Sequence, residues 1–325
     1  MAIFDNKIVL ITGGTGSFGR RFAGVLLKRY NPKKVIIYSR DELKQHEMQQ
    51  QFKEYNNIRF FIGDVRDKDR LLMALHGVDF ILHTAALKQV PAMEYNPAEA
   101  VKTNTLGAMN IIDAAIERAV KKIIALSTDK ACNPINLYGA TKLCSDKLFI
   151  AGNSYAGKVG TRFSVVRYGN VVGSRGSVVP FFAERIKEKV IPVTDERMTR
   201  FFITLDQAVD FVIKCFGLMH GGELFVPKIP SAKIIDVAKA MAPRCKIKIV
   251  GIRPGEKLHE LMISEDDARN AIEFKNYYIV KPSFPWWSNA VHYKGKKIPD
   301  GFKYASNTNK DWLKGDRLKR ALGVA

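Results

Sequence analysis

The sequence contains no apolar run long enough to cross a lipid bilayer. Its hydrophobic stretches fall short of the roughly 18 residues that a membrane-spanning helix needs. Residues 1–7 lead directly into a strand pattern and have no signal-peptide organisation. We therefore expect a cytoplasmic protein without a membrane span. Its 325 residues, 46% of them hydrophobic, are enough for a large core and for roughly two domains.

Cysteine and tryptophan are scarce. The four cysteines have neither the pairing of a disulfide framework nor the spacing of metal ligands, so we expect reduced thiols and no bound metal. They are Cys132, Cys144, Cys215 and Cys245. Cys132 and Cys144 lie in the segment that carries the catalytic candidates, but the sequence supplies no activating partner for either thiol. For Trp286 and Trp287 the sequence indicates no functional role, and buried packing is the default expectation.

Acidic residues are few relative to basic ones. Asp and Glu number 32 against 52 Lys and Arg, which gives a net charge of +20. Such a charge is typical of proteins that bind nucleic acid or an anionic membrane surface. Here the basic residues are spread along the chain, and no aromatic-and-basic RNA-binding pattern accompanies them. We therefore expect no nucleic-acid partner, and we interpret the charge as a solvated surface that attracts an anionic cofactor and substrate.

Short apolar runs alternate with helical patterns over the first half of the chain, which is typical of βαβ units and a parallel sheet. Strands are expected at residues 7–12, 35–38, 58–62, 80–83, 122–126 and 161–167. Helices are expected at residues 17–30, 43–55, 98–118 and 138–151. The predicted fold class is α/β, a Rossmann-type doubly wound parallel sheet with a smaller C-terminal α/β part. The expected domains are residues 1–175 for the dinucleotide and 176–325 for the substrate, with segments near 200–225 returning to the first domain.

A glycine-rich segment, GGTGSFG at residues 13–19, lies between the first predicted strand and the first predicted helix. Glycine permits a tight turn there and lets backbone N–H groups approach a pyrophosphate at the helix N-terminus. A plain turn is the alternative, but the strand-before, helix-after context favours a dinucleotide site. The expected contacts are Gly13, Thr15, Gly16, Ser17, Phe18 and Gly19.

The end of the second predicted strand indicates which dinucleotide binds. An acidic residue there suits the ribose 2′-hydroxyl of NAD, whereas basic residues suit the 2′-phosphate of NADP. Ser39, Arg40 and Lys44 favour NADP, while Asp41 leaves NAD open. Asp64 and Val65, after the third strand, are expected at the adenine end, although Asp64 could instead cap a helix.

Tyr138 and Lys142 are four residues apart in a helical pattern, so both side chains lie on one face. A phenol with a reference pKa of about 10 is a weak base at neutral pH, and a cation one turn away favours its ionised form. A Tyr-x-x-x-Lys pair occurs by chance in many helices. It becomes specific here because it follows a glycine loop and lies about ten residues beyond a strand that ends at Thr128.

Together the glycine loop, Thr128 and the Tyr138–Lys142 pair resemble the extended short-chain dehydrogenase/reductase family. The resemblance covers most of the chain, including residues 85–91, 167–171 and 253–257. It implies that Ala85, Ala86 and Lys88 contact the cofactor, with Lys88 also near the substrate. It further implies that a nucleotide sugar is held by Asn170, Val178, Arg200, Arg253 and Glu256.

The triplet Thr128-Asp129-Lys130 narrows the resemblance. Ordinary hexose 4,6-dehydratases of this family carry Glu in the third position, and 4-epimerases lack this ionisable pair. The Asp-Lys version, with residues 85–91, resembles the inverting UDP-N-acetylglucosamine 4,6-dehydratases. These 5-epimerising enzymes begin pseudaminic acid biosynthesis, and related forms serve capsule or O-antigen pathways.

This resemblance implies a redox-neutral lyase reaction. Tyr138 would take the O4 proton while hydride leaves C4, and a neutral Lys130 would then remove the C5 proton of the 4-ketone. We expect desolvation and a nearby cation such as Lys142 to lower the pKa of Lys130. A protonated Asp129 would donate to the departing C6 hydroxyl, after which hydride returns to C6. The alternative for Asp129 and Lys130 is a surface ion pair without chemistry.

Two rival functions remain open. One keeps the fold and changes the reaction to a retaining 4,6-dehydratase or a 4-epimerase of a nucleotide sugar. The other is a non-catalytic NADP-binding sensor, which has no need of Tyr138, Lys142, Asp129 and Lys130 together. The resemblance also implies a homo-oligomer, a dimer through paired helices near residues 98–118 and 138–151, with a hexamer left open.

Overall fold

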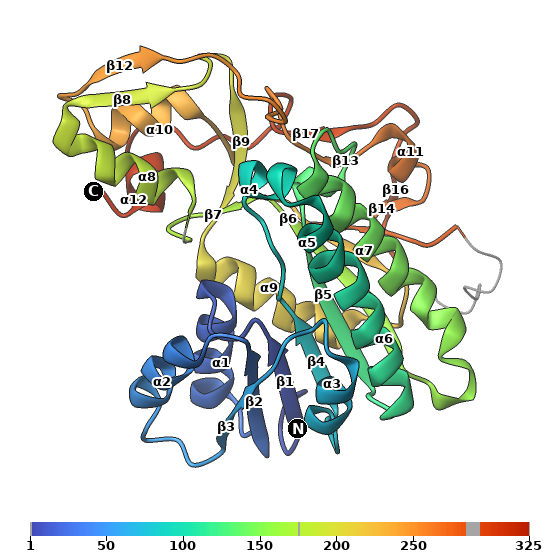
Figure 1. The fold of residues 1–325 in the computed structure, drawn as a ribbon. Coiled ribbons are helices and arrows are strands. Elements are labelled where there is room, and N and C mark those ends of the chain that lie inside the picture. Colours follow the sequence, from blue (N-terminus) through green and yellow to red (C-terminus); the bar gives the residue numbers. More distant parts are fainter. Residues whose placement is uncertain (1, 175, 284–292, 325) are drawn as a thin grey trace.

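The computed structural model describes residues 2–174, 176–283 and 293–324. Trp286 and Trp287 lie outside these residues. A large sheet with helices on both faces forms one part of the molecule, and a smaller group of helices and short strands lies beside it (Figure 1). Throughout the described residues, helices with the length and hydrophobicity of a membrane span are absent.

Ten strands form the main sheet. They are β1 (Ile8–Thr12), β2 (Lys34–Ser39), β3 (Ile58–Ile62), β4 (Phe80–His83), β5 (Lys122–Thr128), β6 (Arg162–Tyr168), β10 (Leu224–Pro227), β14 (Ala271–Glu273), β15 (Tyr277–Val280) and β16 (Lys296–Lys297). Their order is β16-β14-β15-β10-β6-β5-β4-β1-β2-β3. The strands from β10 to β3 pair in parallel, and β14, β15 and β16 add antiparallel pairs at one edge. The order β3-β2-β1-β4-β5-β6 is that of a Rossmann fold, which confirms the predicted fold class.

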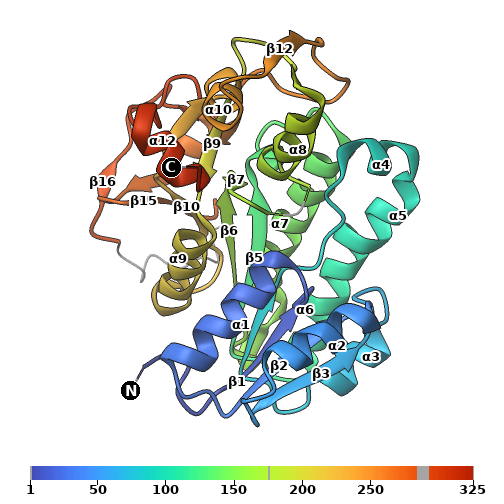
Figure 2. The same ribbon diagram turned by 90° about the vertical axis from the view of Figure 1, so that its left-hand side faces the viewer.

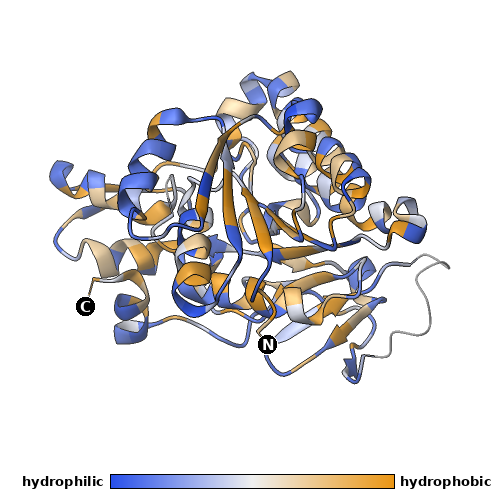
Figure 3. Cartoon of the chain, turned by 90° about the horizontal axis from the view of Figure 1, so that it is seen from below, coloured by the Kyte–Doolittle hydropathy of each residue, from blue (hydrophilic) through white to orange (hydrophobic). Residues whose placement is uncertain are grey.

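The central strands β1 and β4 are buried at consecutive residues rather than at alternate ones. In β1, Val9, Leu10 and Ile11 are fully buried, and β4 is buried at every position. Strands of a parallel sheet are buried on both sides because helices cover both faces of the sheet. Figure 3, seen from below, shows these hydrophobic strands enclosed between the helical layers.

Helices on the two faces of the main sheet come from distant parts of the chain. They are α1 (Ser17–Arg29), α2 (Glu42–Gln51), α3 (Lys68–Ala74), α4 (Val90–Tyr95), α5 (Pro97–Val101), α6 (Gly107–Glu117), α7 (Leu137–Tyr155) and α9 (Leu205–Leu218). Helix α9 packs against α1 on one face, whereas α3, α6 and α7 form a layer on the other (Figures 1 and 2). Thr204 and Gln207 form a capping box that starts α9.

The helix predicted over residues 98–118 is present without a break in the chain of helical residues, but it contains a π-helical turn. A π-helical turn at Lys102–Leu106 separates α5 from α6, and α3 and α4 are helices that the periodicity did not predict. The turn has a tertiary cause, because it directs the buried side chain of Asn104 toward Leu87. Its Oδ1 accepts from the Leu87 N–H at 2.8 Å, and its Nδ2 donates to the Leu87 carbonyl at 2.9 Å and to Thr141 Oγ1 at 3.1 Å.

The smaller part has its own apolar core. It contains α8 (Val178–Arg185), α10 (Ile234–Met241) and α12 (Gly315–Leu322) with the parallel pair β8 (Val190–Val193) and β12 (Lys246–Ile249). Three short strands, β7 (Asn170–Val171), β9 (Thr199–Ile203) and β11 (Ser231–Lys233), form a separate sheet, and β13 (Leu261–Ile263) pairs with β17 (Tyr304–Ala305) beside α11 (Glu265–Ala268). Phe182, Val237 and Leu318 lie in the core between the three helices.

The second half of the chain is divided between the two parts. Helix α9 and strand β10 lie on and in the main sheet, within the segment expected to return there. Strands β14, β15 and β16 join the same sheet as well. The boundary at residue 175 stays a prediction.

Candidate active site

A cleft of about 1000 Å³ opens beyond the carboxyl ends of the parallel strands and extends toward α8 and α10. The strand order reverses between β1 and β4, and open α/β sheets bind ligands at such a switch point. The cleft brings together all the residues predicted to bind cofactor. They are Gly13, Thr15, Gly16, Ser17, Phe18, Gly19, Ser39, Arg40, Lys44, Asp64, Val65, Ala85, Ala86, Lys88, Tyr138 and Lys142. It also brings together the predicted substrate residues, which are Lys88, Asn170, Val178, Arg200, Arg253 and Glu256.

The glycine loop fits a diphosphate. Gly13 has φ +62°, and a Cβ there would lie 2.9 Å from the Ala85 Cα, so a side chain would clash with the neighbouring loop. A Cβ on Gly19 would lie 2.6 Å from the Gly14 Cα. Gly16 caps α1 without a side-chain hydrogen bond, which leaves the first amides of the helix to a ligand.

Charged residues surround the cleft at the ends of β2 and β3. Asp41 Oδ1 accepts from the Lys44 N–H at 3.0 Å to cap α2, and its other oxygen pairs with the Lys44 ammonium. Arg40 Nη1 lies 3.4 Å from Asp64 Oδ2, which also pairs with Arg66 at 2.8 Å. The carboxylate of Asp41 is therefore already engaged by its own helix, whereas Arg40 remains half-exposed at the cleft.

Tyr138 and Lys142 lie on α7, whose start is set by Asn136. The Asn136 Oδ1 accepts from the Gly139 N–H at 2.7 Å, and its Nδ2 donates to the Gly255 carbonyl at 2.7 Å, which ties α7 to the loop at residues 253–257. Burial raises the pKa of Tyr138 to about 12, and the nearby Lys130 ammonium opposes that rise. Burial lowers the pKa of Lys142, which the Asp146 carboxylate opposes. In the structure Lys130 is thus a cation that favours the phenolate of Tyr138.

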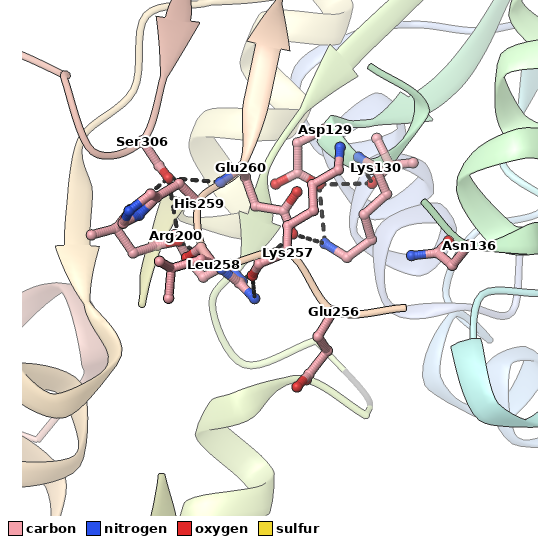
Figure 4. A network of polar contacts seen from close by, with 12 residues as sticks. Asp129, Lys130, Asn136, Arg200, Glu256, Lys257, Leu258, His259, Glu260 and Ser306 are labelled. Carbon is pink, nitrogen blue, oxygen red and sulfur yellow. Dashed lines mark hydrogen bonds and ion pairs between the residues drawn. The ribbon is translucent and has the colours of Figure 1, made fainter. Parts of the chain in front are cut away.

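Lys130 lies between two buried carboxyl groups. Its Nζ is 3.1 Å from Asp129 Oδ1 and 3.2 Å from Glu260 Oε1, and it reaches the cleft with its side chain 25% exposed (Figure 4). The side chains of Asp129 and Glu260 are only 1% and 2% exposed. Thr128 Oγ1 donates to Asp129 Oδ1 at 3.0 Å.

These contacts bear on the protonation state expected of Lys130. Burial alone would lower the pKa of its ammonium, but the charges of Asp129 and Glu260 outweigh burial and raise the pKa above its ordinary value. The lowering of this pKa expected from burial and Lys142 is therefore outweighed in the protein without ligands, and a neutral Lys130 during the reaction stays a prediction. Burial raises the pKa of Asp129, which agrees with a protonated carboxyl, but Asp129 lies behind Lys130 and is not among the residues that line the cleft.

Arg200 is committed largely to the protein itself. Its Nη1 donates to the carbonyls of Thr199 at 2.8 Å and Leu258 at 3.1 Å, and its Nη2 donates to that of Lys257 at 2.8 Å. Its Nε lies 3.5 Å from Glu260 Oε1. Arg200 thus fastens the segment at residues 257–260 to β9, while Glu256 points away from this cluster (Figure 4).

Sequence reasoning missed three residues that shape the site. Glu260 lies three residues beyond the 253–257 motif, and Asn104 is a polar residue in an otherwise helical apolar pattern. Gly139 is required because a Cβ there would lie 2.2 Å from the Lys130 carbonyl oxygen. Cys132, in contrast, stays a thiol, because burial raises its pKa to about 12.

The sheet order, the glycine loop at its switch point and the Tyr138–Lys142 pair define the class of short-chain dehydrogenase/reductase enzymes. Within that class, the chain belongs to the polysaccharide biosynthesis protein family, whose sequence profile matches residues 9–282. The resemblance found in the sequence is thereby confirmed.

Individual relatives cover nearly the whole chain. The UDP-N-acetylglucosamine 4,6-dehydratase (inverting) of Campylobacter jejuni strain 81-176 is 59% identical over 325 residues, with 97% of each chain covered. A UDP-glucose 4-epimerase of Rickettsia conorii is 43% identical over 286 residues, 85% of this chain and 83% of that one. The X-ray structure of Pen from Bacillus thuringiensis matches with a TM-score of 0.88 at 39% identity and covers 94% of both chains.

Proposed function

We propose that this protein is an inverting 4,6-dehydratase of UDP-N-acetylglucosamine, a hydro-lyase that makes UDP-2-acetamido-2,6-dideoxy-L-arabino-hexos-4-ulose. The observation that carries the proposal is the Asp129–Lys130 pair at the end of β5, whose ammonium enters the same cleft as Tyr138. The relative of that name, 59% identical over 97% of the chain, supports the same activity. The corresponding proposed pathway is pseudaminic acid biosynthesis, in which this reaction is the first step.

The cofactor in this proposal is NADP. The glycine loop accepts its diphosphate, and Ser39, Arg40 and Lys44 would hold the 2′-phosphate. Two observations support NADP over NAD: Asp41 is engaged as the cap of α2, and Arg40 borders the cleft. When bound, the nicotinamide supplies the acceptor and donor for the hydride that moves from C4 to C6.

The chain's own residues would move the protons. Tyr138 takes the proton from O4, and Lys130 and Lys142 favour its phenolate. Lys130 then takes the proton from C5 of the 4-ketone, which requires the ammonium first to pass on a proton of its own. Asp129, whose pKa burial raises, would be the source of the proton for the leaving C6 hydroxyl, and it must deliver that proton past Lys130.

Around the rim of the cleft, Asn170, Val178, Arg253 and Glu256 would hold the nucleotide part of the substrate. The exposed guanidinium of Arg253 is a better candidate for the diphosphate than Arg200. Arg200 already donates three hydrogen bonds to backbone carbonyls. Lys88 also borders the cleft, on the loop that Asn104 holds.

We also place the protein in the cytoplasm as a homodimer paired through α6 and α7, with a hexamer as a further assembly. Exposed apolar side chains on this side, including Leu106 at 46%, Met109 at 43% and Tyr155 at 65%, support helix pairing. Light scattering of the wild type and of Met109→Asp tests it: the variant should be half the mass of the wild type or smaller. A wild-type monomer would contradict the pairing.

The direct test is NMR of UDP-N-acetylglucosamine incubated with the protein in deuterated water. A 6-deoxy-4-keto product with deuterium at C5 and inverted configuration is expected. Retained configuration would keep a dehydratase but exclude the inverting activity. Formation of the C4 epimer with no loss of the C6 hydroxyl would favour the 4-epimerase, which the 43% identical relative makes the second candidate. Cofactor binding without turnover of any nucleotide sugar would favour the function of a non-catalytic NADP-binding sensor.

A further inference from the structure

Glu260 is the second carboxyl group on the proposed base, and it comes from a segment 130 residues away in the sequence. Its Oε1 lies 3.2 Å from Lys130 Nζ. Its Oε2 is buried and, within the described residues, has no hydrogen-bond partner. The Oε1 atom therefore lies where it can take a proton from the ammonium, while no described residue donates a hydrogen bond to Oε2 that would hold the carboxyl group in its ionised form.

The position of this carboxyl group is built by the surrounding chain. The Glu260 N–H donates to Ser306 Oγ at 2.9 Å, and Ser306 Oγ lies 2.7 Å from Thr199 Oγ1. Arg200 holds the carbonyls of Lys257 and Leu258 just before it. Figure 4 shows Lys130, from the turn after β5, and Arg200, from β9, both near Glu260. The carboxyl group is thus fixed against Lys130 rather than free to turn toward solvent.

The charges that face Glu260 favour Lys130 as its principal partner. Lys130 and Asp129 approach from the end of β5, Arg200 from β9 and Lys257 from its own segment. Lys257 Nζ donates to the Cys132 carbonyl at 2.6 Å, and the Arg200 Nε is 3.5 Å away. Glu260 thus faces the Lys130 ammonium directly at 3.2 Å, whereas Arg200 and Lys257 also donate to backbone carbonyls.

We propose that Glu260 is the proton acceptor that converts Lys130 to a neutral amine when substrate fills the cleft. An N–H bond of Lys130 breaks and an O–H bond forms on Glu260, which turns a buried ion pair into two neutral groups. The amine then takes the C5 proton: the C–H bond breaks, its electron pair enters the enolate of the 4-ketone, and a new N–H bond forms. The C6 hydroxyl leaves as water with the proton predicted to come from Asp129.

The driving force for this transfer is desolvation. In the open cleft, water reaches Lys130 through its 25% exposed side chain and stabilises the ammonium. A bound sugar displaces that water, and a buried ion pair that loses solvent pays a penalty that its mutual attraction does not always offset. Glu260 acts through Lys130 and has no contact with the reacting carbons, so it is a positioning residue. The inference rests on the proposed dehydratase function.

The test compares Glu260→Gln with the wild type in the same deuterium assay. Glutamine keeps the shape and can accept the hydrogen bond from Lys130, but it cannot take a proton. Product formation and deuterium incorporation at C5 should fall by about 100-fold or more. The remaining rate should rise by about tenfold per pH unit above neutrality, because Lys130 must now lose its proton to solvent. Reduced nicotinamide should accumulate in the near ultraviolet, since oxidation at C4 does not need Glu260.

Two further variants separate this role from a structural one. Glu260→Asp retains a carboxyl group and should recover at least about tenfold over Glu260→Gln with the wild-type pH dependence. Glu265→Gln, on the neighbouring helix and paired with Lys303 on the surface, is the matched control and should behave as the wild type.

Wild-type rates and pH dependence in Glu260→Gln would overturn the inference, and so would a raised KM with an unchanged kcat. If Glu260→Gln does not fold, Glu260→Asp tests the inference instead. The pH dependence of its rate must then match that of the wild type. A wild type that does not turn over the sugar would instead count against the proposed function.

Discussion

Removing the Lys130 ammonium should destabilise the protein in a way that depends on pH. In Lys130→Met, the buried carboxyl group of Glu260 loses its cation, and breaking one partner of a buried pair costs about 3–5 kcal/mol. Glu260 can limit that cost by staying protonated in the folded state. Burial raises the pKa of Asp129 in both proteins, so Glu260, whose pKa Lys130 lowers, is the carboxyl group that should change most.

The sign of this pH dependence follows from the number of protons bound in the folded and in the unfolded state. In the wild type, burial would raise the pKa of Glu260, but the charges of Lys130 and Arg200 hold that pKa below its usual value. The contribution of Glu260 to the free energy of unfolding is therefore present above its unfolded pKa and is lost only in acid. In Lys130→Met the folded protein would hold one proton more than the unfolded chain. Its unfolding free energy should then fall by about 1.4 kcal/mol per pH unit above about pH 4.3 relative to the wild type. The expected loss is about 4.5 kcal/mol near pH 7.5 and about 1.7 kcal/mol near pH 5.5.

Urea unfolding of both proteins at several pH values, with ligand removed, measures this difference. Lys121→Met is the matched control, because Lys121 pairs with Asp79 at 2.8 Å on the surface and is 63% exposed. Its loss should stay below about 1 kcal/mol at every pH. A loss in Lys130→Met that is independent of pH, or below about 1 kcal/mol near pH 7.5, would refute the assignment of Glu260 as the charge partner of Lys130.

Three other substitutions test the cofactor and the chemistry. Gly13→Ala forces a side chain into φ +62° and against Ala85, so NADP affinity measured by calorimetry should fall by more than about tenfold, and wild-type affinity would contradict the glycine-loop assignment. Tyr138→Phe should lower turnover by about 10²- to 10⁴-fold with an unchanged melting temperature, and a smaller effect would exclude it as the base. Arg40→Ala should weaken NADP binding by about tenfold and leave NAD binding unaffected, since it removes a charged contact to the 2′-phosphate. An equal loss of affinity for both dinucleotides would argue against selection of NADP by Arg40.

Local patterns predicted the elements well where the local signal and the tertiary environment agree. The strands β1 and β3 follow from short apolar runs, and α1 follows from a helical pattern after glycine. The predicted helix at 98–118 contains a π-helical turn that the pattern did not predict, and Asn104 within this turn accepts a hydrogen bond from Leu87 on a distant loop. No periodicity within the helix itself indicates that contact.

The sequence by itself determined the parallel sheet, the glycine loop, the Tyr138–Lys142 spacing and the membership of the enzyme class. Each of these features depends on residues that are close together in the chain, where backbone geometry and the helical repeat act directly. Tertiary structure alone decided the charge on Lys130 and the commitment of Arg200 to backbone carbonyls. Both depend on the segment at residues 257–260 folding back onto β5 and β9. A pKa is set by burial and by the charges around a group, and for Lys130 one of those charges, Glu260, is distant in sequence and adjacent only in the fold.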